Sequence, residues 1–369
     1  MKSPLLTLAV GLVGFASTSA QESFLNWQVE IYASPQQQPT WSLTDTLLSQ
    51  SSDSLAASIA FGGPDVRNSA FSFDLWPINL GGGSQDTGGF VMGVEPGVTS
   101  DPFANYLMVQ WAGASNAFLD DTACTPGGNA APGLRLYRVR GVPTEDELWQ
   151  GADFDLACSP EGIGLELLAE AENLGSTPWS GMPANFAVEL GPCSLRIDVD
   201  GVREFDLSGD FENLSGTQLG AYSISLPVFM ADYFSGPLAN YASFESIGTG
   251  SMGTDRVPEL TTTGCPTDGG DFELQLSPSN DGVIGLGLLA IGGTSATLPL
   301  SQYMATLYTL PVAYIPITTA PGTPFVQPIQ LIPDPTLVGE DFYAQAGWID
   351  TGAAGGAAFS NAIRLVVGS

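Results

Sequence analysis

The sequence predicts an all-β protein, in which an antiparallel β-sandwich is followed by a second, smaller β-sandwich. Short runs of β-branched, aromatic and other apolar residues alternate with turn-rich segments over residues 23–247. Similar runs resume after Cys265, and convincing helical periodicity is scarce throughout. Many short strands at close spacing are typical of antiparallel sandwiches and barrels.

The first twenty residues have the three parts of a secretory signal. Lys2 supplies a positive start, residues 5–15 form an apolar run, and residues 18–20 are small, as a cleavage site requires. The apolar run is too short to remain in a bilayer as a spanning helix. We therefore expect a signal peptide at 1–20 and a chain that is secreted or held at the cell surface, with a periplasmic location as the alternative.

Charge narrows the range of partners. The chain has 39 acidic side chains against nine basic ones and no histidine, so its formal net charge is −30. Nucleic-acid binding draws its affinity from Lys and Arg that neutralise phosphates, and anionic membrane surfaces attract the same basic clusters. We therefore expect no nucleic-acid partner and no membrane insertion after signal removal. An acidic surface instead suits an exported protein in saline surroundings.

The first domain is expected over residues 21–247. Residues 163–173 within it fit either a strand or a short helix, because their apolar positions match neither period cleanly. The clearer strands are expected at 27–32, 56–61, 69–75, 89–94, 106–111, 134–139, 186–190 and 219–225.

Residues 195–207 predict a β-hairpin with a two-residue turn at Asp200 and Gly201. Such a turn needs positive φ, which Asp and Gly tolerate. It would set Asp198 opposite Arg203 on the neighbouring strand, as a pair of opposite charges.

Continuing that register would place Ile197 opposite Glu204, which pairs an apolar residue with a charged one. A bulge of one residue near Glu204 would correct the mismatch. Ile197 would then lie opposite Phe205, and Leu195 opposite Leu207.

A linker is expected at 248–264, where Gly, Ser, Thr and Pro are frequent. The second domain is expected over 265–369. Its strands are expected at 272–276, 283–291, 305–317, 325–332, 342–348 and 362–367.

The four cysteines are Cys124, Cys158, Cys193 and Cys265. An even number in an exported chain predicts two disulfides, and four cysteines allow three pairings among which the sequence does not select. Cys124 with Cys158 is the first pairing to consider, because both lie in loops rich in Pro, Gly and Asp. A zinc site is not expected, since no pair has the C-x-x-C spacing and histidine is absent.

One part of the first domain resembles a known family. The segments that carry this resemblance are Asp86, 89–93, 106–111, 133–136, 147–149, the hairpin at 195–207, 220–222 and 232–235. Together they resemble the concanavalin A-like jelly roll, and most closely the lectin-like C-terminal domain of thrombospondins and its bacterial relatives. The resemblance implies a jelly-roll sandwich of the lectin and glucanase superfamily.

The second domain resembles a C-terminal β-sandwich module of exported bacterial proteins, on residues 337–346 and 360–365. That module often has a second cysteine. The matching region around Tyr303 and Met304 has none, so the partner of Cys265 stays open.

The lectin resemblance implies a place to look for calcium. Legume-type lectins use carboxylates at offsets zero and two, Asn at six and Asp at eleven. Counted from Gln110, this chain offers Gln110, Ala112, Asn116 and Asp121, so both missing ligands are carboxylates. A rebuilt site could use Asp120 with Asp121, and a solvated acidic loop is the alternative.

Asp198 and Asp200 are further metal candidates, because residues two apart on a strand share a face. Ordinary outward charges on a hairpin explain them equally well, with Arg203 neutralising one.

Sugar recognition would use aromatic rings that stack on pyranose faces. Trp76, Trp111, Trp149 and Trp179 qualify by type, and each could equally be a core residue. Trp179 stands out because it lies in a loop-like segment, so its replacement is expected to affect ligand binding more than stability. Trp111, Trp179 and Asn116 are the ligand-binding candidates.

Catalysis by an imidazole or amine base is excluded after signal removal, since histidine is absent and Lys2 is the one lysine. No Glu-x-Asp-x-Glu strand of the kind found in glycosidases of this fold is present. Gln110 and Glu189 match the residue types of glutamic peptidases without a supporting motif. We therefore expect no catalytic residues.

The sequence favours an exported, non-catalytic recognition or adhesion protein that binds a glycan or an extracellular matrix component through the first domain. The alternatives are a carboxylate-dependent glycoside hydrolase of the same fold and a purely structural cell-surface component.

Overall fold

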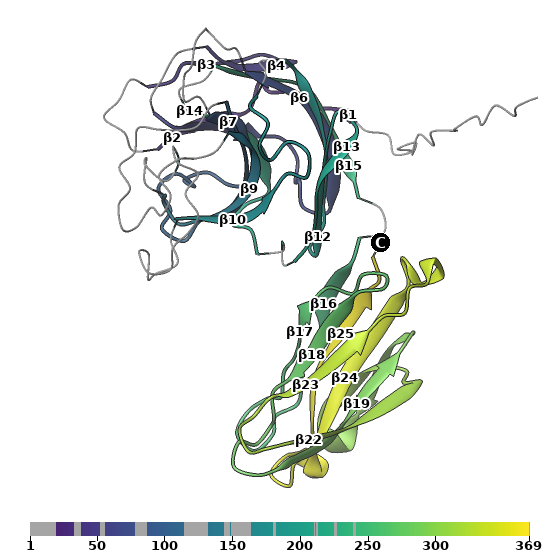
Figure 1. The fold of residues 1–369 in the computed structure, drawn as a ribbon. Helices are drawn as coiled ribbons and strands as arrows, with labels where there is room; N and C mark the ends of the chain where they lie inside the picture. The colour runs from purple at the N-terminus through teal and green to yellow at the C-terminus, as the bar shows by residue number, and fades with distance from the viewer. Residues whose placement is uncertain are drawn as a thin grey trace, which may run out of the picture.

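The structure, a computed structural model, describes residues 20–32, 38–51, 56–77, 87–113, 132–143, 148, 164–179, 182–209, 211, 213–224, 227–238 and 241–368. Its strands fall into two sets (Figure 1). The first fifteen form two large antiparallel sheets, and the last ten form three smaller ones. The expected all-β antiparallel architecture is confirmed. In the described part of the chain, no helix is long and apolar enough to cross a membrane.

The first unit consists of sheets A and B. In spatial order, sheet A contains β13 (Val202–Ser208), β12 (Ser194–Val199), β11 (Ala184–Leu190), β6 (Ser69–Pro77), β15 (Val228–Pro237), β4 (Leu47–Gln50) and β3 (Trp41–Leu43), with β1 (Ala20–Gln21) also paired to β15. Sheet B contains β10 (Gly164–Glu170), β9 (Gly133–Arg140), β8 (Asn105–Ala112), β7 (Thr87–Val94), β14 (Gln218–Ile224), β5 (Ser58–Gly62) and β2 (Gln28–Ile31). The segment left open between strand and helix is therefore strand β10.

The main core lies between the facing surfaces of sheets A and B. Alternate residues of each strand point inward, because the side-chain period of a strand is two. On β8, for example, Leu107 and Val109 join this core, whereas Tyr106 and Met108 belong to a second buried cluster on the opposite face. Sheet B is thus buried on both faces, and sheet A has one face open.

The hairpin of β12 and β13 has the register that the sequence predicts. Asp200 and Gly201 form the turn with φ of 51° and 77°. Asp198 pairs with Arg203, and after a register shift Ile197 pairs with Phe205. Both the turn and the bulge are confirmed.

The bulge turns Glu204 into the interior, where its side chain is only 2 % exposed. Its carboxylate accepts hydrogen bonds from the backbone amides of Asn173 and Leu174, at 2.8 and 3.1 Å. A buried carboxylate requires such partners. Glu204 therefore anchors the loop after β10 to the hairpin, a role that the sequence pattern does not reveal.

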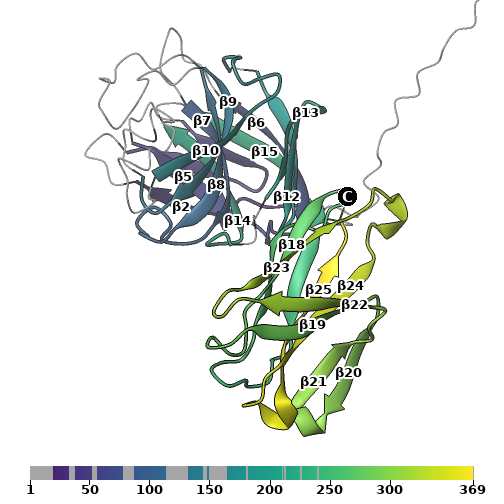
Figure 2. The ribbon, with the colours of Figure 1, turned by 60° about the horizontal axis from the view of Figure 1, so that its bottom comes forward.

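The second unit consists of sheets C and D and a hairpin (Figure 2). Sheet C contains β16 (Ser243–Ile247), β25 (Ala357–Val366), β24 (Asp341–Ile349), β19 (Gly285–Gly292) and β22 (Ala313–Thr319). Sheet D contains β17 (Leu260–Gly264), β18 (Asp271–Leu276) and β23 (Phe325–Gln330), and the hairpin contains β20 (Ser295–Leu300) and β21 (Ala305–Thr309). Short 3₁₀ turns lie at Ser301–Tyr303, Pro335–Leu337 and Ala354–Gly356.

Strand pairing differs from the expected organisation at three places. Ser243–Ile247 pairs with β25, so it belongs to the second unit and not to the first. Leu260–Gly264 is a strand inside the expected linker, because its threonines pair with β18. The single strand expected at 305–317 is two strands, since the chain turns at Leu310 to Val312. We therefore propose a boundary between the units near residue 242.

The edge strands β22 and β23 each contain a proline, Pro316 and Pro328. Proline cannot donate a ladder hydrogen bond, so it is tolerated at sheet edges and hinders pairing with another strand there. The second unit is thus protected against growth of its sheets at these edges.

A disulfide joins the two units. Cys193, just before β12, is bonded to Cys265, just after β17, with their Cα atoms 5.4 Å apart. Ala242 and Phe244 pack against the bridge. This bond decides the pairing of Cys265, whose partner lies in the first unit and not within its own sandwich.

Cys124 and Cys158, the first pairing considered from the sequence, lie outside the described residues. Their pairing stays a prediction.

Asp350, which follows β24, ties three segments of the second unit together. Its carboxylate accepts hydrogen bonds from the Thr254 amide at 2.8 Å, the Ser279 hydroxyl at 2.7 Å and the Gly352 amide at 3.0 Å, and from the Thr254 hydroxyl. Burial opposes ionisation of this carboxyl, but the hydrogen bonds outweigh it and lower its pKa to about 2.

We expect the double replacement Cys193→Ser with Cys265→Ser to destabilise the protein. The bridge spans 72 residues, and the entropy of closing a loop of this size corresponds to about 4 kcal/mol. Guanidinium unfolding of the variant and the unaltered chain measures the difference. Equal midpoints would show that the bridge does not restrain the unfolded chain.

We expect Asp350→Asn to cost about 2 kcal/mol at pH 7. The pKa is lowered on folding, so the carboxylate stabilises the protein above the pKa of an unfolded aspartate, near 3.8. This contribution is lost as the pH falls toward about 2. Urea unfolding at pH 7 and at pH 2 should therefore show a difference that disappears in acid. A difference that is the same at both pH values would contradict this account.

Candidate functional site

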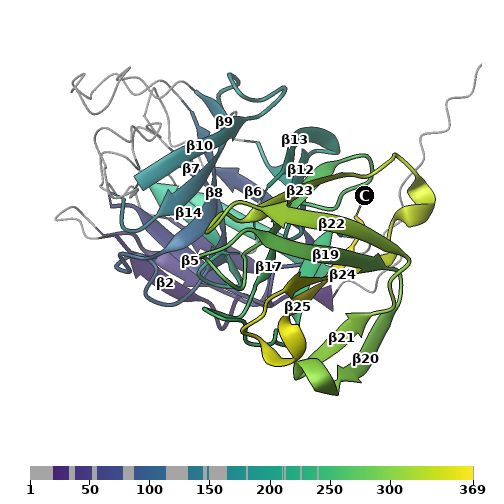
Figure 3. The same cartoon turned by 90° about the horizontal axis from the view of Figure 1, so that it is seen from below.

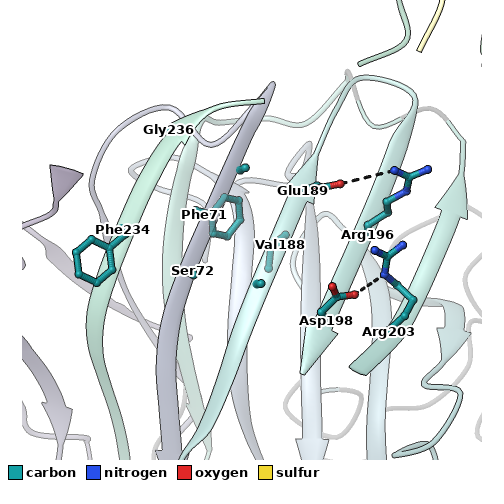
Figure 4. A pocket seen from close by; sticks show the side chains of 11 residues that line it. Phe71, Ser72, Val188, Glu189, Arg196, Asp198, Arg203, Phe234 and Gly236 are labelled. Atoms are coloured by element: carbon teal, nitrogen blue, oxygen red, sulfur yellow. Dashed lines mark hydrogen bonds and ion pairs between the residues drawn. The ribbon is translucent and has the colours of Figure 1, made fainter. Parts of the chain in front are cut away.

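The open face of sheet A carries a hollow of about 280 Å³, which we call the outer-face hollow (Figure 4). Five neighbouring strands, β13, β12, β11, β6 and β15, form its floor. Since the inward residues of these strands fill the core, the outward residues line the hollow.

Two rows of side chains run across the five strands. The first row, from β13 to β15, is Arg203, Asp198, Ala187, Ser72 and Phe234. The second row is Asp206, Arg196, Glu189, Ala70 and Gly236. Ala187 and Ser72 in the first row and Ala70 and Gly236 in the second are small and leave the space. Charged residues border this space on one side, and Phe234 lies at its other side (Figure 4).

The charged border is a ladder of opposite charges. Arg196 contacts Glu189 at 3.7 Å and Asp206 at 3.3 Å. Arg203 contacts Asp206 at 3.2 Å and forms a shorter contact with Asp198. The hydrogen bond with Asp198 raises the pKa of the Arg203 guanidinium above its ordinary value. Because each partner fixes its neighbour, the ladder presents hydrogen-bonding groups in set positions to a ligand on this face.

A second bulge gives Phe234 its outward position. Asp232, with φ of 50°, is the extra residue, and the register shifts between Ala231 and Phe234. Tyr233 therefore points into the core, and Phe234 lies on the outer face, where it lines the outer-face hollow. Without the bulge these two rings would exchange faces.

Sequence reasoning misses Arg196 and Phe234 as site residues. The signal for Arg196 is present, because it alternates with the inward Leu195 and Ile197 on a predicted strand. Phe234 has no comparable signal, since its side depends on the bulge at Asp232.

Of the hairpin aspartates, Asp198 lies in the outer-face hollow and Asp200 lies at the turn. Asp198 is paired with Arg203, and Asp200 accepts a hydrogen bond from the Asn185 amide at 2.9 Å. Both carboxylates have protein partners, and a role for the pair in metal binding stays a prediction. Within the described residues, no group of three or more His, Cys, Asp or Glu side chains could hold a metal.

Asn116, Asp120 and Asp121 lie in the segment 114–131, outside the described residues. Their roles in ligand and calcium binding stay predictions.

Trp111 and Trp179 come together in the core, not at a surface. Their rings stack with centroids 5.1 Å apart and an angle of 6°, and both side chains are 6 % exposed. The Trp111 indole donates to the Thr177 carbonyl oxygen at 2.8 Å. Trp179 does lie in a loop, as expected, but this loop closes one end of the core. Its burial predicts that its replacement lowers stability, contrary to the expectation from the sequence, and its role in ligand binding stays a prediction.

The second face of sheet B is filled where the structure describes it. Gln110 is buried there and donates to the Leu148 carbonyl oxygen at 2.9 Å, and the hydroxyls of Tyr32 and Tyr106 bond to each other. Burial raises the pKa of the Tyr106 phenol, so this cluster stays uncharged. Glu189 lies on the outer face of the other sheet, so Gln110 and Glu189 cannot form one catalytic pair.

No family model matches the chain, and no curated protein matches its sequence. Solved structures with similar parts include the carbohydrate binding module CBM66 from Bacillus subtilis, at 11 % identity over 56 % of this chain and 96 % of that chain, with a TM-score of 0.33. The VIP36 exoplasmic/lumenal domain in its Ca²⁺- and Man-bound form has 13 % identity over 57 % of this chain and 83 % of that one, with a TM-score of 0.38. The Bacillus licheniformis β-glucanase has 10 % identity over 59 % of this chain and 96 % of that chain, with a TM-score of 0.32. These neighbours have lectin and glucanase folds, and likenesses this low say nothing about what the present chain binds.

We expect Trp179→Ala to lower the free energy of unfolding by about 4 kcal/mol, because it removes a large buried ring that stacks on Trp111. Phe103→Ala is the control, since that ring is 86 % exposed and its loss should change little. Chemical denaturation of both variants measures the effect. Equal stabilities for the two variants would contradict the burial of Trp179.

Proposed function

We propose that this chain is an exported, non-catalytic recognition or adhesion protein that binds an uncharged glycan in the outer-face hollow. One observation carries the proposal: an open sheet face combines a ladder of fixed polar groups with an aromatic ring across a hollow of about 280 Å³. Proteins bind sugars with such a combination, in which an aromatic ring packs on the pyranose face and polar groups form hydrogen bonds with the sugar hydroxyls.

The charge of the chain supports an uncharged ligand. A net charge of −30 repels sulfated and uronic polysaccharides. Arg196 and Arg203, the basic side chains of the outer-face hollow, are both paired with carboxylates. A neutral glycan needs no free cation and can use the outer lone pairs and protons of the ladder.

Recognition is preferred to hydrolysis because the carboxylates of the charged ladder, Glu189, Asp198 and Asp206, each contact a guanidinium. A glycosidase acid instead works in apolar surroundings that keep it protonated.

Export is supported by the disulfide, which persists in oxidising compartments. The closer relation to the thrombospondin-type domain, a calcium ion at Asp120 and Asp121, and a matrix component as the ligand remain parts of this proposal.

We expect Phe234→Ala to weaken glycan binding about tenfold, the equivalent of one lost ring contact. Affinities would be measured by calorimetry for a neutral glycan found in a panel screen, with the full chain in calcium buffer and again with EDTA. Phe103→Ala, which removes an exposed ring outside the hollow, is the control. Binding that Phe234→Ala leaves unchanged would remove the hollow from the site, and no binding across the panel would favour a structural surface component. An EDTA effect would support the calcium ion.

A further inference from the structure

Residues 282–333 contain no Asp, Glu, Lys or Arg, although 13 % of the whole chain is charged. This stretch forms β19, β20, β21, β22 and β23 of the second unit. Several of its apolar side chains face solvent, among them Leu286 and Leu288, each 49 % exposed. Exposed apolar surface of this extent marks an interaction site.

The exposed face forms a groove of about 650 Å³, which we call the apolar groove. Its floor is the outer face of sheet C, where three rows cross β22, β19 and β24. The rows are Thr318, Leu286 and Ile349; Pro316, Leu288 and Gly347; and Tyr314, Ala290 and Gln345. Ala290, next to Leu288 along β19, has a small side chain, and the Phe359 ring of β25 lies against Gly347.

The β20–β21 hairpin forms the wall of the groove, and β21 packs against β24 and β25 (Figure 3). Gln345 ties this hairpin to the floor. Its amide nitrogen donates to the carbonyl oxygens of Thr306 at 2.9 Å and Ser360 at 3.0 Å, and its amide oxygen accepts from the Tyr308 amide at 2.8 Å. The hydrogen-bonding capacity of Gln345 is therefore used inside the protein. A ligand in the groove would meet carbon atoms, with the hydroxyls of Tyr314 and Thr318 at the rim.

Electrostatics exclude a charged ligand. The arginines of the second unit, Arg256 and Arg364, are paired with Asp281 and Asp341. An anionic head group would therefore find no cation among the residues that line the groove, in a chain of net charge −30. A cationic head group would find no carboxylate to pair with, because no Asp or Glu lines the groove.

Shape excludes a second copy of the chain as the occupant. In a two-fold dimer, the apolar groove of one copy would face the apolar groove of the other. The space inside both grooves would then stay empty. A groove of this volume instead matches the size of small-molecule sites.

We propose that the apolar groove binds an uncharged lipid, a long hydrocarbon chain that ends in a hydroxyl or ester group. The chain lies over Leu286 and Leu288, and its neutral end lies at the rim beside Tyr314.

The test uses the full chain and the neutral fluorescent probe N-phenyl-1-naphthylamine. We expect the probe to bind with enhanced fluorescence, and dodecan-1-ol to displace it. Dodecanoate, which is ionised at pH 8, should need at least a tenfold higher concentration. Leu288→Glu should weaken probe binding at least tenfold, whereas Ile332→Glu, which alters a 77 % exposed side chain outside the groove, should not.

Tyr314→Ser is the second variant, should Leu288→Glu fail to fold, because its side chain is 61 % exposed. It should lower the affinity for dodecan-1-ol severalfold. Absent probe binding, equal displacement by dodecanoate, or equal affinities for Leu288→Glu and Ile332→Glu would each overturn the proposal. Sedimentation that shows dimers broken by Leu288→Glu, without probe binding, would assign the face to a second copy instead.

Discussion

The register of sheet A decides which side chains reach the core and which reach the outer face, and two bulges set that register. At Glu204 the extra residue brings Ile197 opposite Phe205, and the buried carboxylate holds the loop at Asn173. At Asp232 the extra residue places Tyr233 in the core and Phe234 on the outer face. A slip of one residue on either strand would exchange the two faces. The core and the outer-face hollow therefore depend on the same pairing.

Charge is distributed unevenly over the two units. The outer-face hollow holds Arg and acidic side chains in alternation, so its groups are polar but locally balanced. No charged residue lines the apolar groove, and most of its lining residues lie in the uncharged stretch 282–333. The chain has a net charge of −30, which repels anionic partners but not uncharged ones. An uncharged partner also has no charged group whose hydration would be lost on binding to either surface. The two proposed ligands, a neutral glycan and a neutral lipid, are consistent with this arrangement.

The two units are joined by more than a linker. Cys193 and Cys265 form a covalent bond at the junction, and Ala242 and Phe244 pack beside it. Pairing of β16 with β25 begins immediately after this point. The second unit is thus held at the end of sheet A that carries the start of β12, whose outward residues Arg196 and Asp198 line the outer-face hollow.

Local pattern alone determined many of the strands, the Asp200 turn and the bulge near Glu204, because alternation, turn chemistry and charge pairing act between residues close in the chain. It also indicated Asp198 as a site candidate, since outward residues can be counted along one strand. Tertiary structure decided the rest: the partner of Cys265, the burial of Trp179 against Trp111, the transfer of Ser243–Ile247 to the second unit, and the place of Phe234 beside the charged ladder. Each of these depends on which distant strands become neighbours, and neighbours in a sheet are selected by the burial of whole faces, which no single segment encodes.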